Sequence, residues 1–238
     1  RDMASKMRAA MGCTPIVSAI FANSSLTEGR DNGLASRRVA IWRDTDPDRC
    51  GLLHFVFDPD FGYRDYVEWA LDIPMFFIVR DGRYIQVGNI PFRTFMREGF
   101  GSERACEADW EAHLRTVFPE IRLKKVIEVR GADAVPRGLT CALPALWKGI
   151  LYEDAAREAA WQLVRSFTWE QREAAQIEVA RLGLAGTIAG RPVLGLAREL
   201  TEIAREGLRR IAARGVTDAD ESGFLDPVRA QLELGQSP

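Results

Sequence analysis

The segment from residue 75 to residue 87 contains the feature that most restricts the fold of this 238-residue chain. Residues 75–79 and 84–87 are largely apolar, and Arg80-Asp81-Gly82-Arg83 lies between them. An Asp-Gly pair adopts the two positive φ angles of a type I′ turn, which joins two antiparallel strands. The chain is therefore predicted to contain an antiparallel β-hairpin, and with it at least part of a β-sheet.

The last third of the sequence is instead typical of helices. Thr168 and Gln171 form a capping box, and Gly183 is placed to end the helix that this box starts. Pro192 precedes a second stretch, in which apolar residues recur at helical spacing up to Gly215. This region is predicted to consist of helices that cover a sheet.

Several other segments have patterns that predict an element. They are a helix with Met3, Met7 and Met11 on one core face, ended by Pro15; a buried strand at 16–21; a long irregular loop at 27–51; a strand at 52–57; helices at 61–71 and 109–118; and a strand at 122–130. Together these elements predict an α+β fold, with a part that spans residues 1–153 and a helical region, residues 154–238, packed on it.

Composition and motifs exclude several classes of function. The chain has 32 Lys and Arg against 34 Asp and Glu, so it lacks the basic surplus of a general nucleic-acid binder. No apolar run approaches the ~18 residues of a membrane span. A P-loop, a dinucleotide-binding fingerprint and a nucleophile elbow are also missing from the sequence. We therefore expect neither a nucleic-acid nor a membrane partner.

The cysteines and histidines are sparse. Cys13, Cys50, Cys106 and Cys141 form no C-x-x-C pair and no dense disulfide pattern, which favours a reducing compartment and a cytoplasmic location. Two histidines are too few for a His-rich zinc site. Any metal is therefore expected to be a hard cation bound through oxygen.

One face of the predicted strand at 122–130 is charged. Arg122, Lys124, Glu128 and Arg130 alternate with apolar residues and so point to the same side. A carboxylate there can hold a hard cation while a neighbouring arginine clamps a phosphate oxygen. The alternative is an exposed strand that carries ordinary ion pairs.

The predicted loop at 27–51 and the residues just before it gather polar groups that could bind a carboxylate. The group comprises Asn23, Arg30, Asn32, Arg38, Trp42 and Arg49. Guanidinium groups bind carboxylates through two parallel hydrogen bonds, so this set could bind an amino-acid substrate. The alternative is a salt network on the protein surface.

Six motifs, in the same order, resemble those of the glutamate-cysteine ligases of plant and proteobacterial type. They lie at residues 22–49, 55–62, 91–93, 113–120, 128–133 and 142–147, and the fifth reads Glu128-Val129-Arg130-Gly131-Ala132-Asp133. The similarity runs from the first residues to about Asp154 and continues more loosely through the helical region. The resemblance implies a glutamine-synthetase-like fold, in which an antiparallel sheet forms a bowl around the active site.

The resemblance also implies a reaction. Members of this family join L-glutamate to L-cysteine with ATP and Mg²⁺, through γ-glutamyl phosphate, as the first step of glutathione biosynthesis. On this basis Glu128 and Arg130 would be catalytic, Glu128 as a magnesium ligand and Arg130 as the group that holds the transferred phosphoryl. Lys124, with Arg130, would contact the nucleotide. The residues expected around the amino-acid substrates are Asn23, Arg38, Trp42, Arg49 and Trp147, with core packing as the alternative for Trp147.

Three departures from the family pattern qualify this expectation. Val39 follows Arg38 where the family usually has serine, so one substrate hydrogen bond is lost or supplied elsewhere. Val87 occupies the place of one regulatory cysteine and leaves Cys106 without that partner, so thiol control is not expected. Members of the family are also about twice this length, and we expect this chain to be the C-terminal part of a ligase.

The missing upstream half is then the expected partner, because it would supply further strands and most of the acidic magnesium ligands. Alone, the chain is expected to be inactive and to aggregate or pair with that half through its open strand edges. Two alternatives remain open at the level of sequence. One is a non-catalytic truncated paralogue or binding module, and the other is a ligase of the same superfamily with a different acceptor amine.

Overall fold

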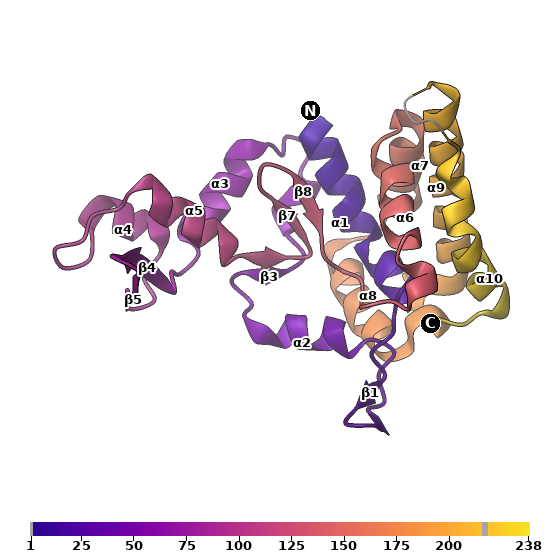
Figure 1. The fold of residues 1–238 in the computed structure, drawn as a ribbon, viewed down its shortest axis with the longest axis horizontal. Coiled ribbons are helices and arrows are strands. Elements are labelled where there is room, and N and C mark those ends of the chain that lie inside the picture. Colours follow the sequence, from indigo (N-terminus) through magenta and orange to yellow (C-terminus); the bar gives the residue numbers. More distant parts are fainter. Residues whose placement is uncertain (1, 216–218) are drawn as a thin grey trace.

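The computed structural model describes residues 2–215 and 219–238 and has the predicted α+β character. Arg1, where the family resemblance starts, lies outside the described residues. The helices are α1 Asp2–Ile20, α2 Arg37–Thr45, α3 Tyr63–Asp72, α4 Phe92–Glu98, α5 Glu107–Arg115, α6 Ala142–Leu151, α7 Asp154–Val164, α8 Trp169–Leu182, α9 Val193–Ala213 and α10 Asp226–Leu234. The strands are β1 Leu26–Thr27, β2 Arg30–Asp31, β3 Cys50–Gly51, β4 Phe77–Arg80, β5 Arg83–Gln86, β6 Phe118–Pro119, β7 Ile121–Leu123, β8 Ile127–Val129, β9 Thr187–Ile188 and β10 Arg191–Pro192. Figure 1 shows α1 and α6–α10 at one end of the molecule, and the β4–β5 hairpin with α4 at the other.

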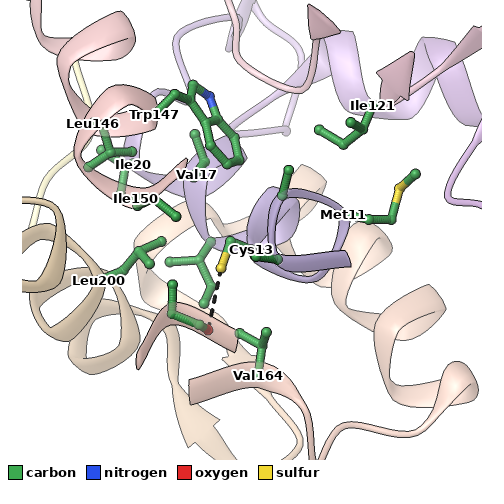
Figure 2. Packing of buried hydrophobic residues seen from close by; sticks show 14 of the residues in the cluster. Met11, Cys13, Val17, Ile20, Ile121, Leu146, Trp147, Ile150, Val164 and Leu200 are labelled. Carbon is green, nitrogen blue, oxygen red and sulfur yellow. Dashed lines mark hydrogen bonds between the residues drawn. The ribbon is translucent and has the colours of Figure 1, made fainter. Parts of the chain in front are cut away.

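Helix α1 is the centre of the main hydrophobic core. Every residue from Ala9 to Ile20 is buried, and the helix contacts α7, α8 and α9. Figure 2 shows Cys13, Val17 and Ile20 of α1 against residues of α6, α7 and α9. A helix that is apolar on all sides is stable only when other elements surround it, which is the situation of α1 here.

Two predictions for this region were wrong. Pro15 lies inside α1 instead of ending it, and residues 16–21 belong to the helix and the turn that follows, not to a strand. Proline removes one backbone donor and disfavours the helix interior, but the burial of the surrounding apolar residues outweighs that penalty. A short apolar run is equally compatible with a buried strand and a buried helix, so periodicity could not decide between them.

The β-structure consists of pairs of strands. β1–β2, β4–β5, β7–β8 and β9–β10 are antiparallel, whereas β3 and β6 pair in parallel. Within the described residues, no sheet has more than two strands. The predicted strand at 52–57 is instead a 3₁₀-helix, His54–Phe57. The predicted loop at 27–51 also contains a helix, α2, which Ser36 caps by accepting a hydrogen bond from the amide of Val39.

The β4–β5 hairpin confirms the strongest sequence signal. Asp81 and Gly82 have φ angles of 49° and 74°, as a type I′ turn requires, and Ile78 faces Ile85 across the strands. Together with α4 the hairpin forms a small hydrophobic cluster of its own, separate from the main core. The helices predicted nearby at 61–71 and 109–118 are present as α3 and α5, although α5 ends at Arg115.

The predicted single strand at 122–130 is a hairpin of two short strands, β7 and β8. Arg122 faces Glu128 directly in the antiparallel register, and the turn lies at residues 124–126. The prediction of one long strand was therefore wrong. Residues 122 and 128 nevertheless share a face, because side chains that pair directly across an antiparallel ladder point to the same side.

The C-terminal helices agree with the sequence pattern. The capping box of Thr168 and Gln171 starts α8, and Gly183 follows its last residue with a φ of 52°. Helices α6 and α9 cross very closely at Gly149. A Cβ on this residue would lie only 2.1 Å from the carbonyl oxygen of Ala204, so the crossing requires glycine. Helix α1, from the first predicted part, shares one hydrophobic core with α6–α9. The predicted division of the chain into residues 1–153 and 154–238 therefore stays a prediction.

Candidate functional site

Two arginines and two aromatic rings meet where α2 approaches strands β6 and β8. The rings of Trp42 on α2 and Phe118 on β6 have centroids 5.5 Å apart. The guanidinium of Arg130, just after β8, lies 5.5 Å from both ring centroids, and that of Arg38 lies 5.9 Å from the Trp42 ring. The fold thus brings three of the predicted site residues, Arg38, Trp42 and Arg130, into one cluster.

Glu128 joins this cluster through Arg130. Its Oε1 accepts a hydrogen bond from Arg130 Nη1 at 2.8 Å, and its two oxygens accept from Arg122 Nη2 at 2.8 and 2.9 Å. Lys124 Nζ lies 3.4 Å from Oε2. Partial burial would raise the pKa of Glu128, but the hydrogen bonds from Arg122 and Arg130 outweigh it and lower this pKa to about 2. Glu128 is therefore a permanent anion at neutral pH.

Arg122 fixes this carboxylate in place. It is largely buried and also donates through Nη1 to the backbone carbonyls of Arg115 and Val117, at 3.2 and 3.1 Å. Arg130 is different, because its guanidinium donates only to Glu128 among the described residues. The remaining N–H groups of Arg130 are available to an incoming anion.

A second carboxylate, that of Glu120, interacts electrostatically with both site arginines, Arg38 and Arg130. Glu120 is only 4% exposed, and its Oε2 has no hydrogen-bond partner among the described residues. Burial raises the pKa of Glu120, while the charges of Arg38 and Arg130 act in the opposite direction. Nη1 of Arg38 is likewise buried without a partner in the described part of the chain.

Unsatisfied buried polar groups are rare in folded proteins, because each one loses its hydrogen bonds to water. Here a buried donor of Arg38 and a buried acceptor of Glu120 occur in one cluster with the free N–H groups of Arg130. Such a concentration is typical of sites that complete their hydrogen bonds with a ligand. The cluster of Arg38, Trp42, Phe118, Glu120, Glu128 and Arg130 is therefore the candidate site.

The close approach of α1 supports this site from behind. A Cβ on Gly131 would lie 2.7 Å from Cγ2 of Thr14 and 3.2 Å from Oε2 of Glu120. Ser18 Oγ donates to the carbonyl of Gly131 at 2.9 Å. Only glycine lets the chain after Arg130 lie this close to the central helix.

The other predicted site residues lie apart from these charges or are bonded to the backbone. Asn23 donates through its side-chain amide to the carbonyl of Ala134 at 2.9 Å. Arg49 is 2% exposed and donates to Asp46 at 2.6 Å and to the carbonyl of Pro74 at 2.9 Å. Both side chains therefore have structural partners already.

Trp147 lies on α6 within the main hydrophobic core. Figure 2 shows its ring near Val17, among buried residues of α1 and α6. This placement matches the core-packing alternative that the sequence left open. The structure does not bring Trp147 into contact with the arginine cluster through any interaction among the described residues.

Lys124 lies between the arginine cluster and a groove of about 640 Å³. Helices α3 and α5 and the β7–β8 turn form the walls of this groove. Its lining combines aromatic, apolar and basic side chains, namely Tyr63, Tyr66, Val67, Trp110, Leu114, Arg115, Lys124, Lys125 and Val126, together with Glu107, Glu111 and Leu123. Aromatic faces with lysines at one end suit a planar, negatively charged ligand.

The described residues do not make a magnesium site by themselves. They contain no group of three or more His, Cys, Asp or Glu side chains placed to hold a metal ion. Both oxygens of Glu128 already accept hydrogen bonds from arginines. Since Mg²⁺ requires near-octahedral coordination by oxygen, one carboxylate in this state does not fit it.

Sequence reasoning missed three members or supports of the cluster. Phe118 and Glu120 lie within a quoted family motif, and Arg122 lies on the charged strand face, but none of them was assigned to the site. The sequence feature that could have identified Glu120 is its position directly after the pair Phe118-Pro119. Its importance depends on burial, which the sequence does not display.

Comparisons with known proteins identify the family of the chain. The model of the family described as glutamate-cysteine ligase family 2 (GCS2) matches residues 1–238. Chloroplastic glutamate--cysteine ligases of Solanum lycopersicum, Medicago truncatula and Arabidopsis thaliana are 40%, 42% and 41% identical to the chain over 240 residues. The alignments cover the whole chain but only 45%, 46% and 45% of these relatives, so the chain spans about half of their length.

The names of these relatives correct one prediction. They are chloroplastic enzymes, which contradicts the cytoplasmic location expected from the cysteine pattern. Free cysteines indicate a reducing environment but do not distinguish one reducing compartment from another. No helix among the described residues is long and apolar enough to cross a membrane.

The family model matches the full sequence of the chain. The chain therefore belongs to the glutamate-cysteine ligase family 2.

Proposed function

We propose that this chain is the C-terminal part of a ligase that joins the side-chain carboxylate of L-glutamate to the amine of L-cysteine. The proposal includes ATP as the energy source and γ-glutamyl phosphate as the intermediate. The names of the relatives support the substrates, and the coverage of about half their length supports a partial chain. The observation that carries the proposal is the pair of partly unsatisfied arginines, Arg38 and Arg130.

These two arginines suit the anions of such a reaction. Carboxylates and phosphoryl groups accept paired hydrogen bonds from a guanidinium, and a partly buried arginine binds them more strongly than an exposed one. Arg130 is held by Glu128 on one side only, which leaves its other N–H groups for a phosphoryl group. Arg38 has a free buried donor for the carboxylate of an amino acid.

The groove beside Lys124 supports a nucleotide contact. Its aromatic walls could hold a base, and Lys124, which also approaches Glu128, is placed between that groove and the arginine cluster. In-line phosphoryl transfer depends mainly on positioning and on neutralising the charge of the phosphates. Lysine and arginine side chains in one continuous region meet that requirement.

In this proposal the binding of magnesium depends on the missing upstream half of the protein. The described residues do not fit Mg²⁺ by themselves, so Glu128 is proposed as a ligand only in the assembled protein, where other oxygen ligands would come from residues outside those described. Each sheet among the described residues has only two strands, and we propose that upstream strands add to them to form the glutamine-synthetase-like bowl. The upstream half is therefore the proposed partner of this chain.

The test is phosphate release from ATP in the presence of glutamate and cysteine. We would measure it for the chain alone and for the chain fused behind the upstream half of the tomato relative. The fusion is expected to be active only with glutamate and an amine, and Arg130→Lys is expected to lower turnover by about a hundredfold or more. Arg229→Lys is the matched control, because Arg229 forms an exposed ion pair with Glu202 on the far helices.

The outcomes separate the competing functions. A fusion that folds but releases no glutamate-dependent phosphate would leave a non-catalytic role. Faster turnover with another amine than with cysteine would identify a different acceptor. Activity of the chain alone would remove the need for an upstream half.

A further inference from the structure

Asp133, three residues after the site residue Arg130, is a buried carboxylate that accepts three hydrogen bonds. Oδ2 accepts from the backbone N–H of Asn23 and from Oγ of Ser24, both at 2.7 Å, and Oδ1 accepts from Oγ of Ser36 at 2.8 Å. All three donors lie more than ninety residues away in the sequence. Asp133 thus ties the end of the β8 segment to the segment that leads into α2.

The two serine hydroxyls pass this connection on to the first turn of α2. Ser24 Oγ accepts from the amide of Arg38 at 3.1 Å, and Ser36 Oγ accepts from the amide of Val39 at 3.3 Å. A hydroxyl has one proton, and here each proton is directed to Asp133, so the lone pairs face the helix amides. One carboxylate therefore orients both hydroxyls that cap amides in the first turn of α2.

Helix α2 carries Arg38 in its first turn and Trp42 one turn later, whereas Arg130 belongs to the β8 segment. We propose that Asp133 is a positioning residue, which sets the location of Arg38 relative to Arg130 through Ser24 and Ser36. Its negative charge also lies close enough to favour the charged form of Arg38. The residue acts on the spacing of two anion-binding groups and does not itself have to touch a substrate.

Other contacts keep α2 attached when Asp133 is changed. The amides of Ala35 and Ser36 donate to the carbonyls of Arg181 and Ala180 on α8, at 3.2 and 3.0 Å. These bonds hold the start of α2 against α8 but do not connect it to β8. Loss of the Asp133 contacts should therefore displace Arg38 relative to Arg130 without unfolding the chain.

The first experiment measures hydrogen exchange in the chain itself, by mass spectrometry, and does not depend on any enzymatic activity. In Asp133→Asn the new NH₂ group cannot accept a hydroxyl proton, so at least one cap loses its orientation. Exchange across residues 37–45 is expected to accelerate about fivefold or more, as the loss of a helix cap implies, with no change in α9. Ser24→Ala and Ser36→Ala should each give part of this effect. Asp220→Asn is the matched control, because Asp220 accepts from the amide of Ser222 far from α2.

The second experiment rests on the proposed function and uses the full-length fusion described above. Asp133→Asn is expected to raise KM for glutamate about tenfold, with kcat changed much less. In an Arg38→Lys background the same substitution should add little, because the two residues act through one element. Equal losses in both backgrounds would show that Asp133 does not act through Arg38.

Unchanged exchange in α2 for Asp133→Asn and both serine variants would overturn the proposal, whatever the activity. Accelerated exchange with unchanged kinetics would restrict Asp133 to a structural role and would also overturn it. If the wild-type fusion is inactive, the proposed function fails, and crystal structures of the wild-type chain and of Asp133→Asn are then compared for the position of Arg38 relative to Arg130. An Arg38 that keeps its distance from Arg130 in the variant would reject the proposal.

Discussion

Arg122 on β7 and Glu128 on β8 face each other across the antiparallel register, and the guanidinium of Arg122 contacts both oxygens of Glu128. Arg122 is buried, while Glu128 is partly exposed and also binds Arg130. The pair therefore joins a buried anchor to a residue of the candidate site. It links the stability of the β7–β8 hairpin to the geometry of Arg130.

Glu128→Gln is expected to destabilise the chain, because the buried guanidinium of Arg122 loses its counter-charge. We expect a decrease of about 1–2 kcal/mol in the free energy of unfolding, since partial exposure of Glu128 limits the effect. Urea denaturation followed by circular dichroism measures it. Glu199→Gln, in the exposed pair with Arg191, is the control and should change little. Equal effects of the two substitutions would contradict a special role of the Arg122 pair.

Acid should remove the contribution of Glu128 at a defined pH. Its pKa is lowered to about 2 in the folded chain, whereas its ordinary value is 4.5. A carboxyl with a lowered pKa stabilises the folded state fully above its unfolded pKa and loses this effect as pH falls through the folded one. The stability difference between the wild type and Glu128→Gln should therefore shrink between about pH 4.5 and pH 2. A difference that stays constant over this range would contradict the assignment.

Glu120 should show the opposite sign. Burial raises its pKa in the folded chain, so the charged form is disfavoured by folding. Its effect is to lower stability as pH rises above the ordinary value of 4.5. Glu120→Gln should remove that part of the decline, which a series of urea titrations between pH 4 and 8 would show. A wild-type and a variant curve with the same slope would contradict it.

Because α6 and α9 cross closely at Gly149, we expect one methyl group added there to lower the stability of the chain strongly. Gly149→Ala would place a Cβ within 2.1 Å of a backbone carbonyl, so we expect a loss of about 2 kcal/mol or more in stability. Gly195→Ala in α9 is the matched control, because among the described residues no atom from outside its own stretch of helix lies within 4 Å of its Cβ position. That control should stabilise the helix by about 0.5–1 kcal/mol. Thermal denaturation of both variants tests the close packing of the two helices.

Short-range chemistry allowed several elements to be predicted from the sequence. The turn at Asp81 and Gly82 and the capping box at Thr168 depend on residues within four positions of each other, and both were confirmed. The candidate residues Arg38, Trp42 and Arg130 were also brought together by the fold. The roles predicted for these three residues, and those predicted for Asn23, Arg49, Lys124, Glu128 and Trp147, stay predictions.

Elements that depend on distant partners were predicted poorly. Pro15 and residues 16–21 are helical because α7, α8 and α9 surround α1, and no pattern within that segment records this. The segment predicted as one strand at 122–130 instead folds back on itself, with Arg122 opposite Glu128, and β7 is buried along its whole length. In each case local propensity was compatible with two structures, and tertiary burial selected one.

The sequence by itself determined the α+β class, the β4–β5 hairpin, the capped helix α8 and the family. Only the tertiary structure decided that Glu120 is buried beside two arginines and that Asp133 connects β8 to α2. The physical reason is that burial and electrostatic coupling arise between segments that lie far apart in the sequence, such as those of Ser36 and Asp133, which are 97 residues apart. Such contacts exist only after the chain has closed around α1, and they give the individual carboxylates their different properties.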